Sequence, residues 1–463
     1  MDADLAGLIE QGHSFLLNKD FVSAEACFNR AVALNGMCSM AHNNLGWTYE
    51  HLGNSQSAMN SYQRALELDP NLTLAKVNLA SLMTKSGQEQ GALPLWHDLV
   101  EEGLFDRQSL NEAIDAALNV GAIHQAARWA QICGAVTRGA PLYAPEVKPI
   151  CRDELAPAML KLETLTHDIE QIEYLRRSSG KPNIDFESML INYKLVRDAL
   201  LISGDRGRRA LDDKEQRLIG DTYGRIWHIR KSSETISAPL WGDWNPSDVE
   251  RAYSNSPLGL CVVDNFLSDE VLTELQNFCL ESTVWLANHY SHGRLGAFFR
   301  EGFVSPLLLK LADQFPRLFP NLIGDRHRLL QIWGFKYSAF QPNTNPHADF
   351  AAVNLNFWIT PDDANLDRKS GGLVVYDLEA PLSWSHNSYN KNGPEIAAFL
   401  RQNGARAIYI PYRANRAVFF NSDLFHATAP LSFRNEYRSR RINITMLYGR
   451  RANDTKRPPR SPN

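Results

Sequence analysis

Three side chains of the types that bind transition metals stand in the C-terminal half of the chain. His347 and Asp349 lie two positions apart in the segment NPHADF, and His426 follows later in FNSDLFHAT. Because residues i and i+2 of an extended strand point to the same side, His347 and Asp349 could both reach one ion. Two imidazoles and one carboxylate can occupy one face of an octahedral Fe(II) ion and leave the other positions open. We therefore predict a metal site formed by these three residues.

The order of the segments around these residues is stronger evidence for a metal site than the three residues alone. The chain contains 13 histidines, so one His-x-Asp pair can occur by chance, and a single histidine beside a strand is more often structural. The order of segments is more informative: a strand, the pair, further strands, a turn at Gly371 and Gly372, a strand, the second histidine and an arginine-bearing strand. This order, over residues 256–451, resembles the 2-oxoglutarate- and Fe(II)-dependent oxygenase superfamily, especially its prolyl-hydroxylase-like branch.

The resemblance implies an enzyme, a dioxygenase that uses Fe(II), 2-oxoglutarate as co-substrate and O₂ to hydroxylate its substrate. His347, Asp349 and His426 would then be the metal ligands and the catalytic centre. Related halogenases have a small residue in place of the carboxylate ligand. The presence of Asp349 therefore favours hydroxylation, or another oxidation, over halogenation.

The strand RRINITML is the candidate site for the far carboxylate of 2-oxoglutarate. Arg441, Asn443 and Thr445 alternate with apolar residues and therefore share one face of this strand. An arginine guanidinium can bind a carboxylate through two parallel hydrogen bonds. The R-x-N-x-T pattern resembles the co-substrate strand of AlkB-type oxygenases, which implies Arg441 as the carboxylate ligand and Asn443 as a second co-substrate contact. Arg438 and Arg440 are alternatives if the register of the strand differs.

Other residues refine this interpretation. Tyr337 precedes His347 at a position where related enzymes often have a tyrosine, and it could donate its hydroxyl to the co-substrate; packing is the alternative role. Leu447 stands where AlkB-type enzymes have a second arginine, which argues against a nucleic-acid demethylase. Asn354 and Asn356 share one face of an apolar strand, where they could line the site or link neighbouring strands.

The C-terminal part is expected to fold as a double-stranded β-helix, or jelly roll. Alternating, aromatic and β-branched residues predict strands at 328–340, 351–360, 371–378, 406–412, 416–422 and 441–449. A further strand at 259–266 leads into a helix with Ser268 as its N-cap and Glu270 in its first turn. Many short strands over this length indicate a sandwich or jelly roll. Such a fold directs side chains from several strands to one open end, which suits a metal site.

The first third of the chain repeats with a period of 34 residues. Small residues recur at Ala24, Ala58, Ala92 and Ala126, aromatic residues at Phe28, Tyr62 and Trp96, and glycines at Gly53, Gly87 and Gly121. Small and large residues four apart share a helix face, so one helical hairpin can pack into the next. The segment 41–71 resembles the tetratricopeptide repeat family, which implies an α-solenoid over residues 4–136 with a degenerate fourth repeat. Such arrays present a groove that binds peptides or proteins, and self-association as a homodimer is the alternative.

The remaining segments complete the expected organisation, a multidomain α + β protein. Residues 137–250 are expected to form a Pro-containing linker and a helical spacer or brace, and 452–463 a disordered tail. The net charge of −4 argues against a nucleic-acid partner. The sequence lacks an apolar run long enough to span a membrane and a signal-peptide pattern, and its six cysteines are scattered. A cytoplasmic protein with reduced thiols and no membrane association is expected.

These patterns together predict an oxygenase that hydroxylates a protein or peptide side chain recruited by the repeats. One alternative is a small-molecule hydroxylase whose repeats serve oligomerisation. Another is a non-catalytic repeat scaffold with an oxygenase-like fold.

Overall fold

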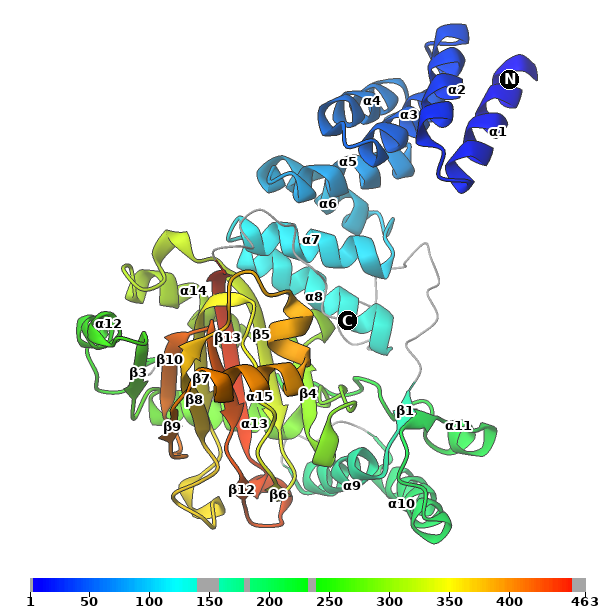
Figure 1. Ribbon diagram of the computed structural model, residues 1–463. Coiled ribbons are helices and arrows are strands. Elements are labelled where there is room, and N and C mark those ends of the chain that lie inside the picture. The colour runs from blue at the N-terminus through cyan, green and yellow to red at the C-terminus, as the bar shows by residue number, and fades with distance from the viewer. Residues whose placement is uncertain (1–2, 140–157, 179–183, 232–238, 452–463) are drawn as a thin grey trace. The chain divides into compact units, whose positions relative to one another are not determined.

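The computed structural model describes residues 3–139, 158–178, 184–231 and 239–451 (Figure 1). These residues divide into two compact units, the first ending at Ala122 and the second beginning at Ile123. Most of the expected linker at 137–150 and all of the expected tail at 452–463 lie outside the described residues. No helix within the described ranges is long and apolar enough to cross a membrane.

The first unit consists of helices that follow one another as antiparallel hairpins, as the 34-residue period predicts. The described helices are α1 (Ala3–Leu17), α2 (Phe21–Leu34), α3 (Ser39–His51), α4 (Ser55–Leu68), α5 (Thr73–Lys85), α6 (Glu89–Glu101) and α7 (Arg107–Asn119). Equivalent side chains begin equivalent helices: Asp20 accepts a hydrogen bond from the Ser23 amide, and Asn54 accepts one from the Ser57 amide. Such N-caps satisfy amides that the helix itself leaves unpaired.

Gly12 and Gly46, which are 34 residues apart, are required by close contact between helices. A Cβ atom on Gly12 would lie 2.6 Å from the ring of Phe28, and one on Gly46 would lie 2.7 Å from the ring of Tyr62. Turns between helices use glycine for its backbone freedom; Gly53, for example, has a φ of 78°. The sequence pattern therefore reports the packing of a helical repeat.

The second unit begins with helix α8 (Ile123–Arg138), the last helix of the predicted repeat array. Its Gly134 lies against the backbone of Glu301, where a Cβ would come within 3.1 Å of the carbonyl oxygen. Arg138 also forms a 3.1 Å ion pair with the carboxylate of Glu301. Helix α8 therefore packs against the segment that carries Glu301.

A helical segment with its own apolar cluster follows. It contains α9 (Leu162–Arg177), α10 (Phe186–Ser203), α11 (Asp213–Ile219) and a short ladder between β1 (Met159–Leu160) and β2 (Arg209–Ala210). Glu170 of α9 forms a 2.8 Å ion pair with Arg440, and Gln171 donates to the carbonyls of Leu280 and Ser282. The segment thus contacts the residue next to Arg441 as well as the end of a helix in the β-rich part.

The β-rich part contains antiparallel sheets (Figure 1). One has six strands in the order β3-β10-β7-β13-β5-β4 and another has three in the order β11-β8-β9; β12 pairs with β6. The bounds are β3 (Leu260–Val263), β4 (Leu295–Phe298), β5 (Leu329–Lys336), β6 (Phe340–Gln341), β7 (Ala351–Trp358), β8 (Leu373–Glu379), β9 (Ala407–Ile410), β10 (Ala417–Asn421), β11 (Leu424–Thr428), β12 (Leu431–Ser432) and β13 (Ile442–Arg450). The expected β-rich region is confirmed. His426 lies on β11, a strand that is not predicted from the sequence.

Apolar layers cover both faces of the six-stranded sheet. On one face, Phe357 and Phe419 meet a group of aromatic rings that includes Phe266, Phe315 and Phe319. Phe315 belongs to α14 (Pro306–Leu318), and α13 (Asp269–Glu281) begins at Ser268 as predicted. The other face shares a buried cluster with the three-stranded sheet. Two further helices are α12 (Pro246–Asn255) and α15 (Gly393–Gln402).

Candidate metal centre

Backbone pairing brings the three predicted ligands together. The amide of His347 donates to the carbonyl of His426 at 3.0 Å, and the amide of His426 donates back at 2.8 Å. The amide of Asp349 donates to Ser422, which lies between β10 and β11. One ligand atom from each of His347, Asp349 and His426 lies within 4.8 Å of the others. The segment that precedes β7 and the strand β11 therefore place all three side chains around one point.

Hydrogen bonds orient both imidazole rings in the same way. Nδ1 of His347 lies 3.2 Å from the carbonyl oxygen of Asn345, and Nδ1 of His426 lies 3.0 Å from that of Leu424. A carbonyl oxygen can only accept, so the proton of each neutral ring is on Nδ1. The lone pair of each Nε2 is then available to a metal, and Nε2 of His426 lies 3.4 Å from Oδ2 of Asp349.

Burial and neighbouring charges set the protonation states that metal binding needs. Burial, followed by repulsion from His426, lowers the pKa of His347 to about 4. Burial works to raise the pKa of Asp349, but the nearby imidazoles of His426 and His347 lower it overall. A neutral imidazole beside an ionised carboxylate is the form that binds a metal.

Asp349 is held by a buried neighbour on β7. Nδ2 of Asn354 donates to Oδ2 of Asp349 at 2.6 Å, and both residues are at most 3% exposed. The other asparagine of this strand, Asn356, donates instead to Thr445 at 2.9 Å. Of the two roles that the sequence left open, Asn354 supports the site and Asn356 links β7 to β13.

Arg441, Asn443 and Thr445 form a hydrogen-bonded row along β13. Nη1 of Arg441 donates to Oδ1 of Asn443 at 3.0 Å, and Nδ2 of Asn443 donates to Oγ1 of Thr445 at 3.3 Å. The alternation expected from sequence is thus present. Arg438 is exposed and Arg440 is paired with Glu170. Of the three arginines, it is therefore Arg441 whose side chain lies in the core beside Asn443.

Arg441 is a buried cation without an acidic partner among the described residues. Its side chain is 1% exposed, and its Nε donates to the carbonyl of Gly371 at 2.6 Å. Its guanidinium carbon lies 4.6 Å from the centroid of the Tyr337 ring and 5.7 Å from that of Trp358. Burial lowers the pKa of Arg441, although the two neighbouring tyrosines oppose this shift. An unpaired buried charge is costly, so an anionic ligand would be favoured here.

Tyr337 connects this region to the strand of His426. Its hydroxyl lies 3.0 Å from Oγ1 of Thr428, two residues beyond His426 on β11. Burial acts to raise the pKa of Tyr337, but the charges of Arg441 and Arg294 lower it overall. Nε1 of Trp358 is buried without a hydrogen-bond partner. Donors and cations therefore gather in the part of the core that contains Arg441.

Arg294 is not among the site residues predicted from the sequence. It directly precedes β4, and its guanidinium carbon lies 5.9 Å from the centroid of the Tyr337 ring. No motif marks it, because only the pairing of β4 with β5 brings it beside Tyr337. Trp384 and Tyr389 belong to an apolar cluster, and the Tyr389 carbonyl accepts from the amide of Ala348. These two residues pack beside the segment that carries His347.

The turn at Gly371 and Gly372 has a steric basis. Gly371 has a φ of 77°, which disfavours residues with a Cβ atom, and its carbonyl accepts from Arg441. A Cβ on Gly372 would lie 1.9 Å from the carbonyl oxygen of Ile410. The Gly-Gly pair therefore lets the backbone approach both β9 and Arg441.

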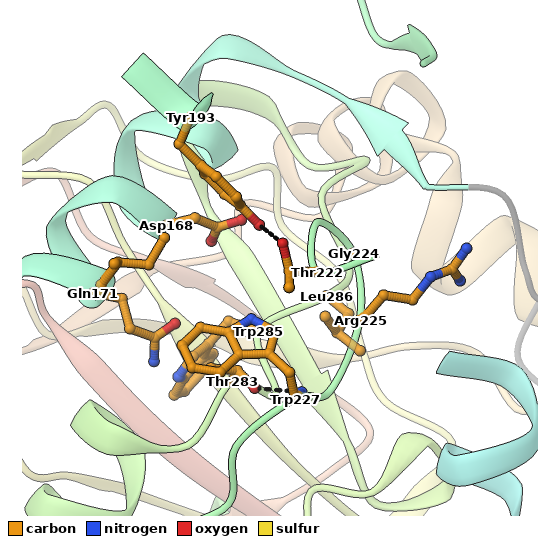
Figure 2. A pocket seen from close by; sticks show the side chains of 11 residues that line it. Asp168, Gln171, Tyr193, Thr222, Gly224, Arg225, Trp227, Thr283, Trp285 and Leu286 are labelled. Atoms are coloured by element: carbon orange, nitrogen blue, oxygen red, sulfur yellow. Dashed lines mark hydrogen bonds between the residues drawn. The ribbon is translucent and has the colours of Figure 1, made fainter. Parts of the chain in front are cut away.

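A separate small recess lies away from the three ligands (Figure 2). Its lining comes from α9, α10 and the segments 222–227 and 283–286. Figure 2 shows the Tyr193 hydroxyl bonded to Thr222, with Asp168 close by. Burial raises the pKa of Asp168 to about 7. None of His347, Asp349 and His426 lines this recess, so it is not the metal site.

Comparisons with known proteins concern the repeats. The family model described as tetratricopeptide repeat matches residues 39–72, which include α3 and α4. No curated protein matches the chain significantly.

Several solved structures, tetratricopeptide proteins among them, resemble parts of the chain. The TPR2B domain of yeast Sti1, in a pHsp70 complex, is 17% identical, with 25% of this chain and 96% of that chain covered and a TM-score of 0.24. YrrB is 18% identical, with 28% and 71% covered and a TM-score of 0.26. MamA RS-1, as a double mutant, is 14% identical, with 45% and 99% covered and a TM-score of 0.28. The match to the family model and the consecutive helical hairpins support a tetratricopeptide repeat domain in the N-terminal region.

Proposed function

We propose that the β-rich part is an Fe(II)- and 2-oxoglutarate-dependent oxygenase. The observation that carries this proposal is the convergence of His347, Asp349 and His426, with ligand atoms within 4.8 Å of one another and both Nδ1 atoms engaged by carbonyls. The donor set fits a ferrous ion, because it offers two imidazole nitrogens and one carboxylate. The buried cation Arg441 adds the positive charge that the far carboxylate of a dicarboxylate co-substrate requires.

We also infer that the antiparallel sheets form a double-stranded β-helix. The six-stranded sheet contributes Asn354 on β7 and the hydrogen-bonded residues Arg441, Asn443 and Thr445 at and beside β13. The three-stranded sheet contributes His426 on β11. The apolar cluster shared by the two sheets supports two facing layers. This arrangement would place ligands and co-substrate contacts between the layers.

Each residue has a distinct task in the proposed mechanism. His347, Asp349 and His426 would hold the iron, and the carbonyls of Asn345 and Leu424 keep a proton on each Nδ1. Bound iron, with 2-oxoglutarate and O₂, would supply the oxidising power toward a C–H bond of the substrate.

The co-substrate contacts complete this arrangement. Arg441 would bind the far carboxylate of 2-oxoglutarate, while Asn443 orients its guanidinium. Tyr337 could donate its hydroxyl to the same ligand, and the rings of Tyr337 and Trp358 exclude water around the guanidinium.

The repeats suggest a protein or peptide as the substrate. Stacked helical hairpins of the tetratricopeptide type present an extended concave surface suited to polypeptide binding. A hydroxylase joined to such a surface can act on a side chain of the bound partner. In the alternatives, the repeats assemble copies of a small-molecule hydroxylase, or the protein is a scaffold without catalysis.

The test is an anaerobic titration of the full-length protein with Fe(II) and 2-oxoglutarate. We expect a weak visible charge-transfer band in the wild type, its loss in His347→Ala and its weakening in Arg441→Met. A folded wild-type protein without the band would refute the oxygenase and favour the scaffold. Deletion of residues 1–122, if the rest stays folded, then tests recruitment: an unchanged KM for a protein substrate would refute it.

A further inference from the structure

Arg294 is a second arginine beside the candidate metal centre. The register of β4 with β5 pairs Leu295 with Lys336 and so brings Arg294 next to Tyr337. Its guanidinium carbon lies 4.3 Å from the centroid of the Tyr290 ring and 4.8 Å from that of Phe335. These aromatic faces fix the guanidinium in one place.

Arg294 lacks an acidic partner among the described residues. Its Nε atom is buried and has no hydrogen-bond partner. Two other arginines of this unit do have acidic partners: Arg416 is paired with Asp264 and Arg440 with Glu170. A positioned guanidinium with a free donor is a binding group for an anion.

Tyr337 links Arg294 to the strand that carries His426. The guanidinium carbon of Arg294 lies 5.9 Å from the centroid of the Tyr337 ring, and the Tyr337 hydroxyl lies 3.0 Å from Oγ1 of Thr428, two residues beyond His426 on β11. Arg441 also lies against the Tyr337 ring, at 4.6 Å from its centroid, so two guanidinium groups flank one tyrosine. An anionic molecule at the metal centre would experience both charges.

The two arginines differ in a way that indicates different ligands. Arg441 is 1% exposed and already donates to Gly371 and Asn443, which suits a small ligand enclosed in the core. Arg294 is half-buried, and so it is accessible to part of a larger molecule. The same charge would repel a cationic group.

We propose that Arg294 binds a carboxylate of the substrate, so that the oxygenase acts on peptide segments that contain aspartate or glutamate next to the oxidised residue. This inference rests on the proposed function of the metal centre. A phosphate group offers the same anionic oxygens, so the test must distinguish phosphoserine from acidic side chains.

The probes are dye-labelled pools of short peptides with random flanks around one fixed position. The fixed residue is aspartate or glutamate, asparagine or glutamine, lysine, or phosphoserine. Binding to full-length protein loaded with Mn(II) and 2-oxoglutarate is measured by fluorescence anisotropy. Succinate release in the presence of Fe(II) and O₂ provides a second readout.

We expect the wild type to bind the acidic pools about tenfold more tightly than the amide pools, as expected for one charge-assisted contact. Arg294→Met should abolish this preference, Arg294→Lys should retain part of it, and Arg294→Glu should shift it toward the lysine pool. Arg317→Met is the matched control, because that side chain is 80% exposed on α14. Its preference should equal that of the wild type.

Three results would overturn the assignment: equal binding of acidic and amide pools by the wild type, an intact preference in Arg294→Met, or no binding of any pool. Tighter binding of the phosphoserine pool would replace the carboxylate with a phosphate. The charge-transfer band is recorded on the same proteins. Its absence from the wild type refutes the oxygenase itself, whereas its presence with no acidic preference refutes only the role of Arg294.

Discussion

His347 and His426 exchange two backbone hydrogen bonds, and their ring centroids lie 4.5 Å apart. The same pairing that joins the two segments also sets the separation of the two imidazoles. Because Asp349 is two residues from His347, its position follows from this bridge and from its own bond to Ser422. Predictions about metal binding can therefore be made residue by residue.

Loss of an imidazole ligand should remove metal binding without unfolding the protein. His347 is only partly buried, so His347→Ala should keep the fold. The affinity for Fe(II) or Mn(II) should fall by more than about 100-fold, because loss of a residue that only supports a metal ligand already lowers affinity by up to that factor. Isothermal titration under anaerobic conditions measures this. His97→Ala is the control, since His97 is an exposed histidine of the repeats. Equal affinities in the two variants would contradict the metal site.

Asn354 and Asn356 should differ although they lie on the same strand. Asn354→Ala removes the donor to Asp349, so metal affinity should fall by about 10- to 100-fold. Asn356→Ala removes a link to Thr445 and should leave metal affinity unchanged while lowering stability. Mn(II) binding followed by electron paramagnetic resonance compares the variants. A larger loss of affinity in Asn356→Ala would show that the assignment of the two roles is wrong.

Arg441→Met should separate co-substrate binding from stability. The variant loses two hydrogen bonds but also removes a buried, unpaired charge, so the free energy of unfolding should change by less than about 2 kcal/mol. Stabilisation of the protein by 2-oxoglutarate should disappear. Thermal unfolding with and without 2-oxoglutarate measures both effects. Arg440→Met is the control: it breaks the pair with Glu170 but should retain the response to 2-oxoglutarate.

Two glycines of the repeats should respond to alanine in opposite directions. In Gly46→Ala the new Cβ would meet the Tyr62 ring, so the free energy of unfolding should fall by about 1–3 kcal/mol. Gly7 lies in α1 with no atom within 4 Å of an added Cβ, so Gly7→Ala should raise it by about 0.5–1 kcal/mol. Urea denaturation followed by circular dichroism tests this. Stabilisation by Gly46→Ala would show that the ring can move away.

Asp264 should make stability depend on acidic pH. Hydrogen bonding from Arg416 lowers the pKa of Asp264, and this effect exceeds the opposing effect of burial. The positive charges of Arg416 and Arg413 lower the pKa of Asp264 further. A carboxyl whose pKa is lower in the folded state stabilises the protein above its unfolded pKa, about 3.9, and this stabilisation is lost as pH falls through the folded value. Asp264→Asn should therefore be clearly less stable than the wild type at neutral pH, and the difference should shrink in acid.

The control for this experiment is Asp325→Asn, because the Asp325 side chain is 94% exposed. Its difference from the wild type should be small at every pH. If the stability gap of Asp264→Asn persisted at a pH well below the folded pKa, the ion pairs with Arg416 and Arg413 would not be its cause.

The sequence by itself determined the features that depend on local pattern. The 34-residue period predicted the helical hairpins because Gly12 and Gly46 are needed where aromatic rings approach the next helix. Alternation predicted most of the long strands, and Ser268 marked the start of α13. Residue types also singled out His347, Asp349 and His426 as possible ligands of one ion.

Only the tertiary structure decided features that depend on pairing between distant segments. The short strand β11 has no distinctive pattern, and it exists because it pairs with β8. The choice of Arg441 over Arg440 required the register of β13, since Glu170 of a distant helix takes Arg440. Arg294 reaches Tyr337 only through the pairing of β4 with β5. Local sequence cannot encode such neighbours by itself, because their positions are set by long-range backbone hydrogen bonds and by the packing of whole sheets.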